Sequence, residues 1–152
     1  MLRFLQNYPR MIEAVYQSIY WLLLIFKPWL NPGGGVERLF IWVEARTKGA
    51  VFDCRMCGQC ILHSTGMTCP MVCPKELRNG PCGGVRPDGK CEVLPEMPCV
   101  WLQAWDRSKR MPMHGIEILQ VQPPLNRQLQ DTSAWINEFT GVARTPPAGW
   151  GQ

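Results

Sequence analysis

Apolar residues recur at helical spacing in two stretches before the centre of the chain. In the first stretch, residues 10–26, they are Met11, Ile12, Val15, Tyr16, Ile19, Tyr20, Leu23 and Leu24. This spacing predicts an amphipathic helix that becomes apolar on all sides near its end. The second stretch, residues 36–46, has one apolar face, formed by Val36, Leu39, Phe40 and Val43. It predicts a second helix, which leads into the centre of the chain.

Helix-breaking and helix-capping residues indicate where the other elements of the chain begin and end. The segment NPGGG, residues 31–35, disfavours helix and separates the two predicted helices. Later in the chain we expect a short helix over residues 100–110, an extended segment over residues 114–124 and a helix over residues 131–141. For this last helix, Asp131 is the predicted N-cap and Gly141 the predicted stop. The final residues, 142–152, have no periodicity and predict a flexible tail.

Glycine and proline are frequent, with 14 of each among 152 residues, so long regular elements throughout the chain are excluded. All eight cysteines lie between Cys54 and Cys99, and the rest of the chain has none. We therefore expect a small irregular fold, in which short helices surround a cysteine-rich metal-cluster core with little β structure. The predicted divisions are an N-terminal helix with a glycine-rich linker over 1–35, a cysteine-rich domain over 36–141 and the tail over 142–152.

The apolar run from Ile19 to Phe26 raises the question of a membrane segment. A bilayer span needs about twenty apolar residues, and this run has eight. Arg10 and Glu13 lie shortly before it, which also argues against a signal peptide. We therefore expect a cytoplasmic protein.

The first predicted helix must still bury its apolar end. Two tryptophans and two basic residues near it are suited to a membrane surface, namely Trp21, Trp29, Arg10 and Lys27. The polar face of the helix is not notably basic, however. The favoured interpretation is therefore packing on this domain or on a partner subunit, and contact of residues 10–30 with a membrane surface is the alternative.

The net charge of +4 comes from residues spread along the whole chain. Lysine and arginine outnumber acidic residues by six to four before Cys54, by five to four from Cys54 to Cys99, and by five to four afterwards. Nucleic-acid binding normally needs clustered basic residues, so we expect no nucleic-acid partner. The chain also has no catalytic triad, paired carboxylates, phosphate loop or dinucleotide fingerprint, and we predict no catalytic residue.

The cysteine spacing indicates metal binding. Cys54, Cys57 and Cys60 are separated by two residues each, which is the local pattern of a ferredoxin run. Five more follow at wider intervals: Cys69, Cys73, Cys82, Cys91 and Cys99. Eight thiolates suffice for two [4Fe-4S] clusters, so all eight are predicted ligands. The order of the cysteines does not say which four share a cluster, and we assign only the first three to one cluster.

The residues between the cysteines suit such clusters. Most cysteines have a glycine within three positions, which lets backbone N–H groups approach the sulfurs. Five basic residues can offset negative charge: Arg55, Lys75, Arg78, Arg86 and Lys90. Six apolar residues can exclude water: Met56, Ile61, Leu62, Met67, Met71 and Val72.

Two alternatives remain open. Two zinc ions would also use eight thiolates, but zinc sites favour paired C-x2-C knuckles and only one such run is present. Disulfides suit secreted scaffolds, and the chain has no recognisable signal peptide. His63 follows Cys60 by three residues and His114 stands alone, and we interpret neither as a ligand.

The same region carries a family resemblance. The blocks TGMTCPMVCPKELRNGPCGG (residues 65–84), GKCEV (89–93) and PCVW (98–101) closely resemble the methylenetetrahydrofolate reductase C-terminal domain. This is the small accessory subunit of iron–sulfur-containing methylenetetrahydrofolate reductases of bacteria such as acetogens. The resemblance extends over about residues 36–141.

The resemblance implies a partner and a role in one-carbon metabolism. In that family the domain is fused to, or encoded beside, a flavin-containing (β/α)8 barrel that reduces methylenetetrahydrofolate. The accessory subunit carries iron–sulfur clusters that exchange electrons with the barrel. We therefore expect a non-catalytic electron-transfer subunit of an oxidoreductase, with further electron-transfer subunits as additional partners. The alternative is a zinc-stapled structural module without redox activity.

Overall fold

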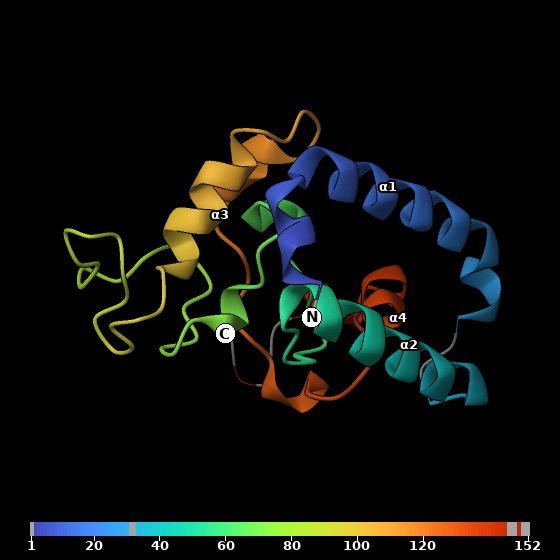
Figure 1. Ribbon diagram of the computed structural model, residues 1–152. Coiled ribbons are helices and arrows are strands. Elements are labelled where there is room, and N and C mark those ends of the chain that lie inside the picture. The colour runs from blue at the N-terminus through green and yellow to red at the C-terminus, as the bar shows by residue number, and fades with distance from the viewer. Residues whose placement is uncertain (1, 31–32, 146–148, 150–152) are drawn as a thin grey trace.

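The computed structural model describes residues 2–30, 33–145 and 149. Four α-helices form the framework (Figure 1): α1 (Pro9–Phe26), α2 (Gly35–Phe52), α3 (Val100–Ser108) and α4 (Ala134–Thr140). Short 3₁₀ helices and loops join them, and the described residues include no β-strand beyond a single bridge between Lys90 and Pro98. The expectation of a mostly helical chain with little β structure is confirmed.

Helix α1 forms where the apolar spacing predicted it. Pro9 stands in its first turn, where the missing N–H costs no hydrogen bond. Tyr16, Tyr20 and Leu23 pack towards the interior, beside the fully buried Glu13. The carboxylate Oε1 of Glu13 accepts hydrogen bonds from the backbone N–H groups of Met113 and His114, at 3.1 and 2.6 Å. These bonds tie the first helix to a segment about a hundred residues away.

Helix α2 is longer than the sequence pattern predicted. It begins at Gly35 and continues through Phe52, beyond the end predicted at residue 46. It ends where Asp53 adopts a left-handed conformation with φ of 56°. Figure 1 shows α1 and α2 running in opposite directions, with α2 delivering the chain to the first cysteines at the centre of the molecule.

Helix α4 fills the space between α1 and α2 (Figure 1). Its buried residues Trp135, Ile136 and Phe139 join Leu30 in one apolar cluster. The predicted N-cap Asp131 is wrong: the cap is Ser133, whose Oγ accepts a hydrogen bond from the N–H of Ile136. Asp131 instead has a φ of 63° and donates its N–H to the cysteine loop.

The C-terminal end of α4 agrees with the sequence. Gly141 ends the helix in a left-handed conformation with φ of 81°, as predicted.

The extended form predicted for residues 114–124 is wrong in its first half, because Gly115–Leu119 is a 3₁₀ helix. This turn is held by an ion pair of His114 Nδ1 with Glu117 Oε1 at 2.8 Å, which a short apolar pattern cannot reveal. Most of the predicted tail, from residue 146 onwards, lies outside the described residues apart from Gly149.

Glu44 of α2 is the buried electrostatic link between α2 and α4. Its carboxylate accepts hydrogen bonds from Ser133 Oγ and from the N–H of Trp135 at 3.2 Å. It also forms an ion pair with Lys48 Nζ at 2.7 Å, and the side chains of Glu44 and Lys48 are only 3% and 11% exposed.

Glu44→Ala should therefore lower the free energy of unfolding by about 3–5 kcal/mol, because it leaves the Lys48 charge buried without a partner. Urea unfolding of the wild type and the variant measures this difference. Glu96→Ala is the control, since Glu96 is 96% exposed and its loss should change little. Equal losses in the two variants would contradict a structural role for Glu44.

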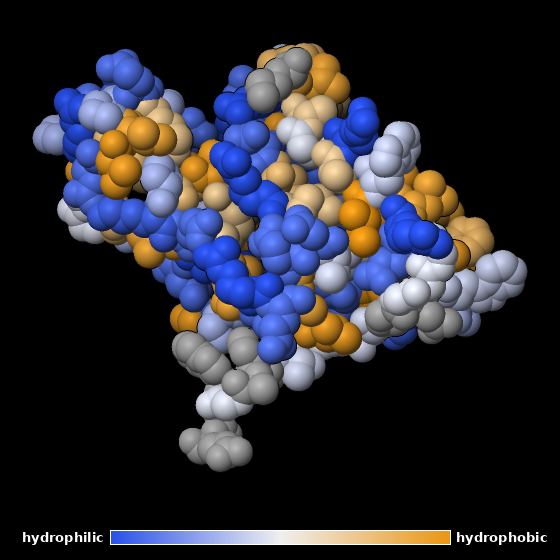
Figure 2. Space-filling model, turned by 90° about the horizontal axis from the view of Figure 1, so that it is seen from below, coloured by the Kyte–Doolittle hydropathy of each residue, from blue (hydrophilic) through white to orange (hydrophobic). Residues whose placement is uncertain are grey.

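The apolar end of the first helix is buried on one side only, where Tyr20, Leu23 and Leu24 pack on Leu30 and α4. Trp21, Ile25 and Trp29 are 62%, 74% and 77% exposed. Figure 2 shows apolar side chains at the surface where α1 ends and α2 begins, at the right of the view. None of the helices in the described residues combines the length and the apolar character needed to cross a membrane.

Candidate metal centre

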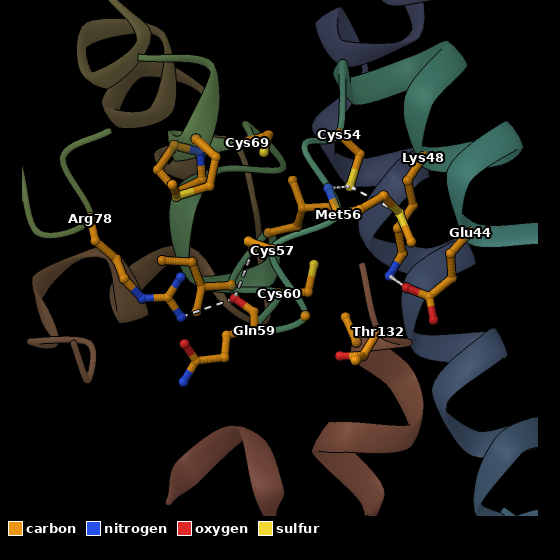
Figure 3. Close-up of a pocket in the computed structure, with 16 residues that line it drawn as sticks. Glu44, Lys48, Cys54, Met56, Cys57, Gln59, Cys60, Cys69, Arg78 and Thr132 are labelled. Carbon is orange, nitrogen blue, oxygen red and sulfur yellow. Dashed lines mark hydrogen bonds and ion pairs between the residues drawn. The ribbon is translucent and has the colours of Figure 1, made fainter. Parts of the chain in front are cut away.

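Four of the eight cysteines line one cavity in the middle of the molecule (Figure 3). They are Cys54, Cys57, Cys60 and Cys69. The cavity is small, with a volume of about 20 Å³. The sequence assigned the first three cysteines to one site, and the structure adds Cys69 to them.

Two left-handed residues shape the loop that carries the first three cysteines. Met56 has a φ of 48° and Gly58 a φ of 70°, so the chain turns twice between Cys54 and Cys60. The turn directs the backbone N–H of Met56 at Cys54 Sγ, at 3.4 Å. The N–H groups two residues after Cys60 and Cys69 donate to those sulfurs in the same way. Such N–H donors stabilise negative charge on sulfur.

Gln59 anchors this loop from the inside and is only 2% exposed. Its side chain donates to the carbonyl of Ala143 at 2.8 Å and accepts from the N–H of Asn126 at 2.6 Å. Its backbone carbonyl accepts from Arg78 Nη2 at 2.9 Å. The C-terminal third of the chain therefore holds the cysteine loop in place.

Three further bonds fasten the loop to the segment before α4. Asn137 Nδ2 donates to the carbonyl of Gly58 at 2.9 Å. The N–H of Asp131 donates to the carbonyl of Met56 at 2.8 Å, and Gln130 donates to that of Arg55 at 2.7 Å. Every one of these bonds joins residues more than seventy positions apart, so the sequence pattern could not predict them.

Cys69 reaches the cavity through a tight reversal of the chain. The 3₁₀ turn His63–Thr65 is followed by Gly66, whose φ is 60°. A Cβ on Gly66 would lie 2.2 Å from the carbonyl oxygen of Ala104 in α3, so only glycine fits. Thr65 Oγ1 closes the reversal with a hydrogen bond to the carbonyl of Thr68 at 2.7 Å.

Two basic side chains border the cavity. Arg78 comes from the loop after Cys73 and is 8% exposed. Its Nε donates to the carbonyl of Pro123 at 3.0 Å, while its Nη1 is buried without a hydrogen-bond partner among the described residues. Lys48 comes from α2, where its Nζ also lies 5.0 Å from the centre of the Trp135 ring. Arg78 therefore places a positive charge beside the cavity, whereas the charge of Lys48 is offset by Glu44, which also lines the cavity.

Of the five basic residues that the sequence suggested, only Arg78 lines this cavity. The other four form ion pairs: Arg55 with Asp53, Lys75 with Glu92, Arg86 with Asp88, and Lys90 with Glu96. Sequence reasoning missed Lys48, because it precedes the cysteine window. Helical spacing could have identified Lys48, because it lies one turn after Glu44 on the inward-facing side of α2.

Burial favours the neutral form of three of these thiols. It raises the pKa of Cys54 to about 11 and that of Cys69 to about 12, and neighbouring cysteines add to both shifts. The pKa of Cys60 is also raised by burial. Burial alone would lower the pKa of Lys48, but a thiolate at Cys60 and the carboxylate of Glu44 both act to raise it, and the pKa lies above its usual value.

The other four cysteines lie in different surroundings. Cys73 borders a surface hollow beside the first loop, and Cys99 is buried at the start of α3. The Sγ of Cys82 lies 3.6 Å from Glu92 Oε1. The hydrogen bond to Glu92 raises the pKa of Lys75, and negative charge on Cys82 and Cys91 acts in the same direction. Both thiols therefore lie near this one ammonium group.

All eight cysteines are free thiols in the structure. Among the residues that the structure describes, no three His, Cys, Asp or Glu side chains converge closely enough to hold a single metal ion. His63 makes two polar contacts: its Nδ1 lies 3.3 Å from the hydroxyl of Tyr16 and its Nε2 lies 3.5 Å from Glu117 Oε2.

Comparison with known proteins gives one match. A family model described as the C terminal of methylene-tetrahydrofolate reductase matches residues 34–128. The matched residues include all eight cysteines, α2 and α3, whereas α1 and α4 lie outside them. Neither the curated proteins nor the solved structures yield a match.

Proposed function

The chain belongs to the methylene-tetrahydrofolate reductase C-terminal family, and on this premise we propose that it is an iron–sulfur electron-transfer subunit of a reductase of that kind. In this proposal the eight cysteines bind two [4Fe-4S] clusters. The first cluster is bound by Cys54, Cys57, Cys60 and Cys69, and the second by Cys73, Cys82, Cys91 and Cys99. The protein acts in the cytoplasm beside a flavin-containing partner.

The observation that carries this proposal is the arrangement of four thiols around one central cavity. A zinc ion with Zn–S bonds of about 2.3 Å needs its four sulfurs within about 4 Å of one another. A [4Fe-4S] cluster needs four sulfurs that surround a space, because four iron atoms lie between them. Thiols that line a cavity suit the second arrangement better.

The surroundings of the cavity fit an anionic cluster. Backbone N–H groups point at the sulfurs of three of the four cysteines. The buried Nη1 of Arg78 has a hydrogen to donate and no partner among the described residues. Lys48 lies on the side of α2, where its charge is paired with that of Glu44. Thiolate ligands with nearby N–H donors and cations are the surroundings that such clusters have in proteins.

When bound, a [4Fe-4S] cluster accepts and returns single electrons. The thiolates of this chain would hold it, and the buried side chains of Ile61, Leu62 and Met71 would exclude water from one side. Arg78 would favour the more negative, reduced state and so raise the reduction potential, whereas the charge of Lys48 is offset by Glu44.

The bond-making chemistry belongs to a partner. A flavin-dependent (β/α)8 barrel has about 250 residues and eight parallel strands. The 152 residues of this chain are too few for such a barrel, and their described part is helical. We therefore propose that this chain passes electrons to or from a methylenetetrahydrofolate reductase-like subunit, with further electron-transfer proteins on the other side.

Metal analysis tests this proposal directly. We expect anaerobically purified protein to be brown, to contain about eight iron and eight sulfide per chain, and to give an EPR signal after reduction. Colourless protein that contains zinc and no sulfide would overturn the proposal. That result would establish the zinc-stapled structural module instead.

A further inference from the structure

Helix α1 exposes an apolar stripe that nothing in the described part of the chain covers. Its residues follow one another at intervals of three or four positions, so they lie on one side of the helix: Met11, Val15, Ile19, Leu22 and Phe26. All five are at least 40% exposed. Monomeric proteins rarely expose a contiguous apolar surface of this kind without a function.

Helix α2 carries a matching stripe. Val36, Leu39 and Val43 are exposed, and Thr47 continues the same side of the helix one turn later. Thr47 and Val51 line a groove between the two helices, together with Met11, Val15 and Ile19 of α1. The groove has about 800 Å³ of empty space that opens to solvent. The two stripes therefore meet at this groove and form one surface, which we call the α1/α2 face.

The exposed charge on α1 and α2 is positive. From Pro9 to Phe52 four of the five basic residues are exposed, namely Arg10, Lys27, Arg38 and Arg46, and the fifth, Lys48, pairs with the buried Glu44. The acidic residues turn inward: Glu13 and Glu44 are buried, and Glu37 is half-buried and accepts a hydrogen bond from the N–H of Gly33. The charge count of the sequence hides this asymmetry, because buried carboxylates contribute little to the field outside.

Tryptophans flank the same surface. Trp21 and Trp42 are 62% and 59% exposed, and Trp29 follows the end of α1. The guanidinium of Arg46 lies 5.6 Å from the centre of the Trp42 ring. Figure 2 shows apolar and hydrophilic side chains next to one another at this end of the molecule. Tryptophan and arginine are the residues that proteins place at the level of lipid headgroups.

We infer that the α1/α2 face binds the surface of an anionic lipid bilayer. The apolar stripes enter the boundary between headgroups and acyl chains, and the exposed basic residues contact the phosphates. The family match by itself does not assign a protein partner to this face, because only its α2 half lies within the matched residues. The charge of the face is the stronger argument, since it complements anionic headgroups.

Co-sedimentation of the full-length protein with vesicles tests this inference. We expect binding to vesicles of phosphatidylcholine with an equal part of phosphatidylglycerol, and at least about tenfold weaker binding to phosphatidylcholine alone. Added salt should weaken the binding, because it screens the exposed arginines and lysine. The assay needs no metal centre, so its result is independent of the proposed electron transfer.

Three variants sharpen the test. Leu22→Glu with Phe26→Glu should abolish vesicle binding, and Arg38→Glu with Arg46→Glu should weaken binding to the anionic vesicles at least about tenfold. The matched control is Val121→Glu, since Val121 is 87% exposed and lies far along the chain from both helices. Circular dichroism checks that all three are folded.

Two results would overturn the inference. One is wild-type protein that stays in solution with both kinds of vesicle. The other is binding that the Leu22→Glu, Phe26→Glu variant retains. If Leu22→Glu with Phe26→Glu instead releases a bound reductase subunit or a second copy of this chain, the α1/α2 face is a protein interface.

Discussion

Cys60→Ser together with Cys69→Ser should remove no more iron than Cys69→Ser alone. Both thiols line the same cavity, so the first substitution already destroys the cluster that the second would affect. About half of the iron should remain in both variants, bound by the other four cysteines. Cys69→Ser combined with Cys91→Ser should remove nearly all of the iron, because it damages both proposed clusters.

Iron and acid-labile sulfide per chain, measured in anaerobically purified protein, decide this comparison. Met113→Ser is the control, since Met113 is exposed and lies outside the cysteine window, and its iron content should not change. If the double variant Cys60→Ser, Cys69→Ser contains no iron while Cys69→Ser alone keeps half, the two cysteines bind different clusters. The assignment of four ligands to the central cavity would then be wrong.

Gly58→Ala should be among the most destabilising single substitutions in the chain. Gly58 has a φ of 70°, which costs a residue with a side chain about 1–3 kcal/mol. The added Cβ would also lie 2.1 Å from the carbonyl oxygen of Leu129 and 2.8 Å from its Cβ. The cysteine loop and the segment before α4 would have to separate, which adds about 1–3 kcal/mol. The loss in free energy of unfolding should therefore exceed about 2 kcal/mol.

Gly49→Ala is the matched control. Gly49 lies inside α2, and a Cβ there would meet no atom within 4 Å. Alanine should stabilise the helix by about 0.5–1 kcal/mol. Urea unfolding of both variants at the same metal content measures the two effects. Similar stabilities for Gly58→Ala and Gly49→Ala would show that the cysteine loop is not pressed against Leu129.

The helices show which parts of the fold local pattern can predict. The start and end of α1 followed from apolar spacing and from the break at residues 31–35, because an amphipathic helix is encoded within its own residues. The N-cap of α4 could not be predicted from the local sequence, because Asp131 and Ser133 are both good N-caps. Ser133 is selected because its hydroxyl also donates to Glu44 of α2. A contact between distant residues decided between two locally equivalent choices.

The candidate site shows the same limit. The eight cysteines and their ferredoxin-like triplet are visible in the sequence, and so is the resemblance that the family match confirms. The position of Cys69 beside the triplet depends on the turn at Gly66 and on the close approach of α3. The basic residues at the cavity also depend on tertiary structure, because proximity in sequence selected four residues that form ion pairs elsewhere.

The sequence by itself determined that this protein is helical and loop-rich, that its thiols lie in one short window, and which family it belongs to. Those properties depend on residue type and local spacing. Only the tertiary structure decided which four thiols surround the central cavity, which cations border it, and that the outer face of α1 and α2 is positive. The physical reason is that burial and proximity depend on contacts such as those of Gln59 and Glu44, which join residues far apart in the chain.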